Sequence, residues 1–147
     1  MPSEFVKEVA DVFAKDGSLS KVTANYTPRP SQIEFATSVA EALEKGKTLV
    51  AEAGTGTGKT FAYLVPALLK DQKVLISTAG KTLQDQLFTK DIPALLKALG
   101  MGCRVALLKG RSNYICKQRL EHALQEDSYV AKSREEVVHL HRIKKFA

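Results

Sequence analysis

The chain has 147 residues, 44% of them hydrophobic, which is enough for one domain with a buried core. Its longest apolar run covers nine residues, about half a membrane span, and neither a secretion leader nor a disulfide framework is evident, so we expect a cytoplasmic protein without a membrane partner. Residues 1–75 carry nine basic and nine acidic side chains, whereas residues 76–147 carry thirteen basic and seven acidic ones, so the net charge of +6 comes from the second half. This excess indicates either contact with a polyanion or an ordinary solvated basic surface.

Two helices are predicted in the first third of the chain. Residues 3–15 form an amphipathic pattern that ends before Gly17. After a loop with two prolines, Ser31 and Glu34 have the spacing of a capping box, so a second helix should begin at Ser31, and Gly46 should end it. The apolar positions of the two helices are Phe5, Val9, Val12 and Phe13, then Ile33, Ala36, Val39, Ala40 and Leu43.

A phosphate-binding loop follows a short apolar strand at residues 48–52. The loop pattern is carried by Ala53, Gly54, Thr55, Gly56, Thr57, Gly58, Lys59 and Thr60. Glycines let backbone N–H groups surround a phosphate, the lysine supplies a cation for the β- and γ-phosphates, and the hydroxyl of Thr60 can bind Mg²⁺. A helix at residues 61–70 would add its positive dipole end, with Pro66 kinking or restarting it.

Two features of this loop are open to a second interpretation. Its opening position holds Ala53 where the pattern has glycine, which is tolerable if that residue keeps ordinary strand-like angles. The whole octapeptide could also be a plain Gly/Thr turn. The strand before it and the helix after it favour nucleotide binding.

The remaining elements continue the alternation of strands and helices. We predict strands at residues 73–77 and 104–108, separated by a polar helix around residues 83–87 and a short helix at residues 93–99. Alternating strands and helices indicate an α/β fold, here part of a RecA-like P-loop domain with about three parallel strands and helices on both faces.

The last third is predicted to be helical. One helix should cover residues 112–126, and Ser133 with Glu136 forms a second capping box for a helix that continues to the end. No Asp-Glu pair follows an apolar strand, so the acidic motif with which hydrolases hold Mg²⁺ has no candidate. We therefore expect the front portion of a larger enzyme, with sheet edges that could promote association.

Three segments, residues 52–60, 76–87 and 107–116, occur in the order and at the separations found in one family. Together they resemble the N-terminal part of bacterial DinG-type DNA helicases, most closely the YoaA branch. These superfamily 2 enzymes are relatives of the eukaryotic XPD helicase and carry an iron–sulfur cluster. The resemblance implies motor domain 1 for residues 1–147, with an iron–sulfur domain starting near residue 112.

The resemblance implies an adenine-reading element in Arg29 and Gln32. An amide suits this task because it offers a donor and an acceptor side by side. Gln32 could instead be an ordinary polar residue of an early helical turn. Tyr26 could stack near the base, although packing on the core is an equal alternative.

DNA contacts are implied for the segment 78–86, in which Thr78, Lys81 and Gln84 can bond phosphates without reading bases. An ordinary capped helix is the alternative. The basic stretch that contains Lys109 and Arg111 could approach single-stranded DNA or be plain solvated surface.

Cys116 matches the first of four thiolates that hold a [4Fe–4S] cluster in the family. Only Cys103 accompanies it here, without a family counterpart, so we expect no intact cluster and a free thiol at Cys116. Three histidines lack metal-ligand spacing to a cysteine, and the role of Glu52 is open; the histidines are His122, His139 and His141.

The leading hypothesis is an ATP-dependent DNA helicase that moves 5′ to 3′ in DNA damage tolerance or repair. Lys59 and Thr60 would stabilise the charge of phosphoryl transfer through the cation and Mg²⁺. We expect this chain to bind ATP weakly and not to hydrolyse it usefully. The alternatives are a P-loop kinase or small ATPase, and a non-enzymatic module that binds a replication or repair protein.

Overall fold

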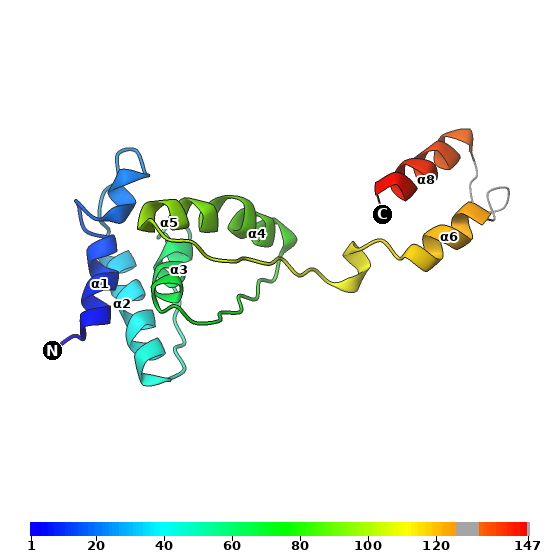
Figure 1. Ribbon diagram of the computed structural model, residues 1–147. Helices are drawn as coiled ribbons and strands as arrows, with labels where there is room; N and C mark the ends of the chain where they lie inside the picture. Colours follow the sequence, from blue (N-terminus) through cyan, green and yellow to red (C-terminus); the bar gives the residue numbers. More distant parts are fainter. Residues whose placement is uncertain (126–132, 147) are drawn as a thin grey trace. The chain divides into compact units, whose positions relative to one another are not determined.

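The computed structural model describes residues 1–125 and 133–146 (Figure 1). The chain forms two compact units, Met1–Leu107 and Leu108–Ala147, and each is described by itself. All regular secondary structure in the described residues is helical. None of the helices described combines the length and the apolar character that crossing a bilayer requires.

The first unit is built around α2, which contacts both α1 and α3. The bounds of its first elements are α1 (Glu4–Val12), η1 (Ser18–Lys21), α2 (Pro30–Lys45) and α3 (Lys59–Leu69). Their apolar faces meet in one core with those of the later helices, in which the largest fully buried side chains are Phe13, Leu19, Leu64, Leu95, Val9, Val65 and Pro66. This core holds α2 and α3 against each other. The phosphate loop lies in the segment between these two helices and leads directly into α3.

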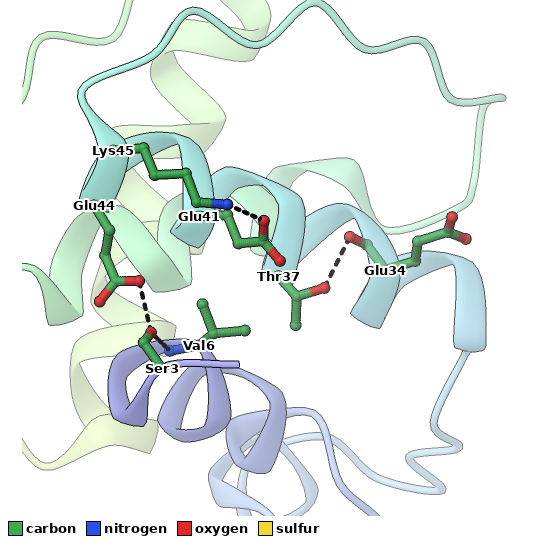
Figure 2. A network of polar contacts seen from close by, with 7 residues as sticks. All are labelled: Ser3, Val6, Glu34, Thr37, Glu41, Glu44 and Lys45. Atoms are coloured by element: carbon green, nitrogen blue, oxygen red, sulfur yellow. Dashed lines mark hydrogen bonds and ion pairs between the residues drawn. The ribbon is translucent and has the colours of Figure 1, made fainter. Parts of the chain in front are cut away.

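The start of α1 is tied to the last turn of α2. The Ser3 hydroxyl accepts a hydrogen bond from the Val6 amide at 3.2 Å and donates one to the Glu44 carboxylate at 2.6 Å (Figure 2). The first contact caps an N–H that the helix itself cannot satisfy. Residues 3 and 44 thus hold the two helices together at their polar ends, beside the apolar core.

The start of α2 differs from the prediction. The helix begins at Pro30, so Ser31 lies inside the first turn, and the N-cap residue Arg29 makes no side-chain cap hydrogen bond. The predicted capping box of Ser31 and Glu34 is therefore wrong. Proline is favoured at the first helical position, since its φ is preset and its missing N–H needs no partner there. Gly46 ends the helix at φ 59° as expected.

Helix α3 begins two residues earlier than predicted, directly after Gly58. It runs through Pro66 to Leu69 without restarting. A proline inside a helix leaves the carbonyl four residues before it without its usual partner. Pro66 is fully buried, and burial of its ring and of the neighbouring Val65 in the core offsets that loss.

A single winding stretch replaces the two separate helices predicted for residues 83–99. It consists of α4 (Lys81–Gln86), a π-helical turn η2 (Leu87–Asp91) and α5 (Ile92–Leu99). Leu87 and Leu95 are buried, which anchors the stretch on the core. α4 has no buried residue, whereas the π turn contributes Leu87 to the core and α5 contributes Ile92 and Leu95.

The three predicted strands are absent from the described residues. Residues 48–52, 73–77 and 104–107 are irregular coil, seen as open trace in Figure 1. Two apolar side chains that a sheet would bury are almost fully exposed, Val50 at 92% and Leu75 at 91%. A strand persists only where its N–H and C=O groups find ladder partners, and these segments do not pair with one another here. The parallel-sheet prediction is therefore not confirmed.

The second unit is helical in its described part. Its elements are η3 (Arg111–Asn113), α6 (Lys117–Gln125) and α8 (Arg134–Phe146), and α6 contacts α8. The helix predicted for residues 112–126 begins only at Lys117, and residue 126 lies outside the described residues. The Ser133 hydroxyl accepts a hydrogen bond from the Glu136 amide at 3.3 Å, as a capping box requires at that end.

Candidate nucleotide-binding site

The phosphate loop connects two helices that contact each other in the core of the first unit. Residues 53–58 form the loop, and α3 begins with Lys59. Gly58 is the N-cap of α3 and provides no side-chain cap hydrogen bond, so the first amides of the helix receive no acceptor from that residue. Such amides, together with the helix dipole, attract an anion.

The backbone of the loop requires glycine at two positions. Gly56 and Gly58 have φ values of 77° and 81°, which side-chain-bearing residues rarely adopt. A Cβ on Gly58 would also approach the Cδ of Gln32 to 2.8 Å. Ala53 is not among the positive-φ residues of the described chain, so the departure from the pattern at this position is tolerated as expected.

Two side chains at the start of α2 donate hydrogen bonds to carbonyls of the loop. The Arg29 guanidinium donates to the carbonyl of Gly56, and the Gln32 amide Nε2 donates to the carbonyl of Gly58 at 2.9 Å. Gln32 is buried, with 7% of its surface exposed, whereas Arg29 is exposed. The structure thus places both predicted adenine-reading residues against the loop.

The ammonium of Lys59 lies within hydrogen-bonding distance of its own loop. It donates to the carbonyl of Ala53 and, at 2.7 Å, to that of Gly54. The Thr57 hydroxyl donates to the same Gly54 carbonyl at 2.9 Å. The positive charge is therefore held over the loop, where a bound polyphosphate would be.

Tyr63, one helical turn after Thr60, is a neighbour that the sequence analysis did not single out. Burial raises the pKa of Tyr63, the Thr60 side chain lowers it, and the negative charge of Asp91 raises it. The spacing of three residues on a helix was the available signal for this pair.

Tyr26 packs on the core, which was one of its two predicted roles. Its hydroxyl donates a hydrogen bond of 3.0 Å to the carbonyl of Phe13, and its ring contacts the core. Burial raises the pKa of Tyr26, while the nearby positive charge of Arg29 lowers it. The residue therefore fastens the loop before α2 to the end of α1.

The residues proposed to touch DNA in the first unit surround the start of α4. The Thr78 hydroxyl donates to the Gly80 carbonyl at 3.2 Å, and Lys81 and Gln84 belong to the first turn and a half of the helix. Lys81 is exposed. At the other end of α4, the Gln86 amide donates to the Asp91 carboxylate at 3.0 Å across the π turn.

The second unit holds the other basic residues of the prediction. The Tyr114 hydroxyl accepts a hydrogen bond of 2.8 Å from the Lys109 amide, and Arg111 lies on the intervening turn η3. The Cys116 side chain is an exposed free thiol. The backbone carbonyl of Cys116 accepts a hydrogen bond from the Leu120 amide at the start of α6. No group of three potential metal ligands occurs among the described residues.

Residues 32–142 match the DEAD/DEAH box helicase family, so this chain belongs to it. Membership implies the RecA-like α/β fold for the complete domain. The match includes the phosphate loop and Gln32, the two features that the first unit brings together.

The chain is similar to three named helicases. It is 56% identical over 113 residues to the ATP-dependent DNA helicase YoaA of Escherichia coli, covering 77% of this chain and 18% of that protein. The ATP-dependent DNA helicase YoaA of Haemophilus influenzae is 47% identical over 123 residues, which cover 84% of this chain and 19% of that protein. The ATP-dependent helicase DinG of Mycobacterium tuberculosis is 45% identical over 106 residues, which cover 67% of this chain and 16% of that protein. The chain thus spans less than a fifth of these relatives, and the resemblance to DinG-type helicases is confirmed.

Proposed function

We propose that this chain is the nucleotide-binding N-terminal part of motor domain 1 of an ATP-dependent DNA helicase. The observation that carries the proposal is the loop of residues 53–58. Its glycine φ values, its lysine and the buried Gln32 amide together make a site for a nucleoside triphosphate. The names of the similar proteins supply the reaction class.

The residues present suit Mg·ATP. The amides around residues 54–60 and the Lys59 ammonium would bind the phosphates, Thr60 would bind Mg²⁺, and Gln32 would read the adenine edge. Bound Mg²⁺ would neutralise charge that develops on the transferred phosphoryl group. Such a site fits the cytoplasmic setting that we expect for an enzyme acting on DNA.

We further propose that residues 48–52, 73–77 and 104–108 become parallel strands where neighbouring strands are supplied. Their apolar composition suits a sheet buried on both faces. In that arrangement Thr78 and the start of α4 would follow a carboxyl strand end, where open α/β sheets bind ligands. Single-stranded DNA is the proposed ligand there, through Thr78, Lys81 and Gln84. Lys109 and Arg111 are proposed, separately, as DNA contacts of the second unit.

An iron–sulfur cluster does not fit this chain alone. A [4Fe–4S] cluster needs four ligands of the thiolate type, and the sequence contains two cysteines. Cys116 remains a proposed first ligand in the family pattern, and no step of the mechanism is assigned to a cluster. The iron–sulfur domain proposed to start near residue 112 falls within the second unit.

Three measurements test the proposal. Isothermal titration with Mg·ATP should show binding, and steady-state hydrolysis should stay well below about 1 s⁻¹, the low end for phosphoryl-transfer enzymes. Single-stranded DNA should bind the chain with an affinity that falls steeply with salt, because contacts to phosphates release counterions. Absence of ATP binding would refute the nucleotide site. ATP binding without DNA binding would favour a small-molecule ATPase or kinase.

A further inference from the structure

Arg29, like Gln32, donates a hydrogen bond to a carbonyl of the phosphate loop. Its guanidinium donates to the carbonyl of Gly56, 27 residues along the chain. The side chain is exposed and extends from the N-cap of α2. A guanidinium carries only donors, so it cannot match the paired donor and acceptor of adenine as the Gln32 amide can.

The contacted carbonyl belongs to a glycine whose peptide no neighbouring atom restrains sterically. Gly56 has a φ of 77° and open space around its missing Cβ, so side-chain sterics do not restrict its peptide. A trans peptide is planar and directs its C=O and the following N–H to opposite sides. Holding the Gly56 carbonyl therefore also fixes the direction of the Thr57 N–H.

The neighbouring peptides of the loop are held by other donors. Lys59 donates to the carbonyls of Ala53 and Gly54, and Gln32 donates to that of Gly58. Arg29 supplies the contact at Gly56, between these two sets. The loop can present its N–H groups to a polyphosphate only if each of these peptides keeps its orientation.

We propose that Arg29 is a positioning residue that sets the phosphate-binding shape of the loop through the Gly56 carbonyl and does not select the base. The proposal rests on the nucleotide site described under the proposed function and changes the role of one residue in it. Arg29 then contributes equally to the binding of any ligand that presents a polyphosphate to the loop. Selection of adenine is left to Gln32.

The test compares ATP, GTP and inorganic tripolyphosphate, each with Mg²⁺, on the full chain and its variants. Arg29→Ala should weaken all three by a common factor of roughly five to ten, in line with loss of one charge-assisted hydrogen bond at an exposed site. Arg29→Lys keeps a donor and a charge and should recover part of the loss. Gln32→Ala should reduce the preference for ATP over GTP while Arg29→Ala should not. An effect of Arg29→Ala on ATP alone, or none on any ligand, would overturn the proposal.

Two further measurements separate positioning from simple charge attraction and from failure of the site. If Arg29 acted only as a distant charge, the loss would disappear near 1 M salt, where screening acts within about 3 Å. We expect it to persist. Without any ligand, the backbone ¹⁵N order parameters of residues 54–58 should fall in Arg29→Ala but not those within α3. Unchanged order parameters would refute the inference whatever the ligand affinities are, whereas wild-type protein that binds none of the three ligands would refute the proposed function instead.

Discussion

Gln32 Nε2 donates a hydrogen bond of 2.9 Å to the carbonyl of Gly58, 26 residues further along the chain. This contact joins the first turn of α2 to the N-cap of α3. Because the amide is buried, the loss of its partner would leave a polar group without compensation. The phosphate loop is thus secured at its end by the core of the first unit.

Gly58→Ala should damage both the fold and the site. The new Cβ would collide with the Gln32 amide, and alanine is strained at φ 81°. We expect a loss of about 2–4 kcal/mol in the free energy of unfolding and no detectable binding of Mg·ATP. Chemical denaturation and calorimetry measure the two effects.

Gly46→Ala is the matched control for that variant. Gly46 also has a positive φ, 59°, but nothing lies within 4 Å of its missing Cβ. Its cost should be limited to about 1 kcal/mol of backbone strain, with nucleotide binding retained. Equal effects of the two substitutions would show that the contact with Gln32 is unimportant.

Lys59→Ala should weaken nucleotide binding by roughly tenfold or more, because a charged donor to the phosphates is lost. The melting temperature should change little, since the lysine bonds only carbonyls of a partly exposed loop. Lys7→Ala, which removes an exposed cation from α1, should leave both quantities unchanged. A large fall in stability with Lys59→Ala would contradict a purely ligand-binding role.

Tyr26→Phe tests the hydrogen bond to Phe13 and the pH dependence of stability. Removing the hydroxyl should cost about 1 kcal/mol at neutral pH. Burial raises the pKa of Tyr26 above its ordinary value of 10.0, so the unfolded chain ionises first as the pH rises. The wild-type protein should therefore lose stability above about pH 10. In Tyr26→Phe part of this alkaline loss should vanish, and Tyr63 should account for a remainder. Identical alkaline profiles would argue against a buried hydroxyl.

Phe13→Ala and Val50→Ala distinguish the core from the open segments. Phe13 is fully buried, so its truncation should cost about 3–5 kcal/mol. Val50 is 92% exposed, and its truncation should cost at most about 0.5 kcal/mol. Urea titrations of both variants measure these values. A cost above about 1 kcal/mol for Val50→Ala would indicate that residues 48–52 pack in a sheet in solution.

Local patterns predicted the helices better than the strands. The helix end predicted at Gly46 was correct, because Gly46 adopts the left-handed conformation that terminates a helix. The end predicted before Gly17 was wrong, because α1 already ends at Val12 with Phe13 as its C-cap. The predicted start of α2 was one residue late, since Pro30 outweighs the serine that follows it. Strands depend on partners distant in sequence, so the apolar composition of residues 73–77 could not show whether such partners are present.

The sequence pointed to candidate residues of the site but not to the contacts among them. The octapeptide identified Lys59 and Thr60 because the motif encodes backbone conformation locally. The contact of Arg29 with Gly56 joins residues 27 positions apart, and the Thr60–Tyr63 pair depends on which face of α3 is buried. Tertiary packing determines both, and a single sequence does not reveal it.

The π turn at Leu87–Asp91 makes the direction of the polar side chains on α4 tolerant of a one-residue change in chain length. An α-helix rotates about 100° per residue, and the wider turn absorbs one additional residue. Deleting a single residue there would restore regular winding and leave the direction of Lys81 and Gln84 around the axis, relative to Leu95, nearly unchanged. A deletion between Asp91 and Leu95, with the π turn retained, would instead swing them by about 100°.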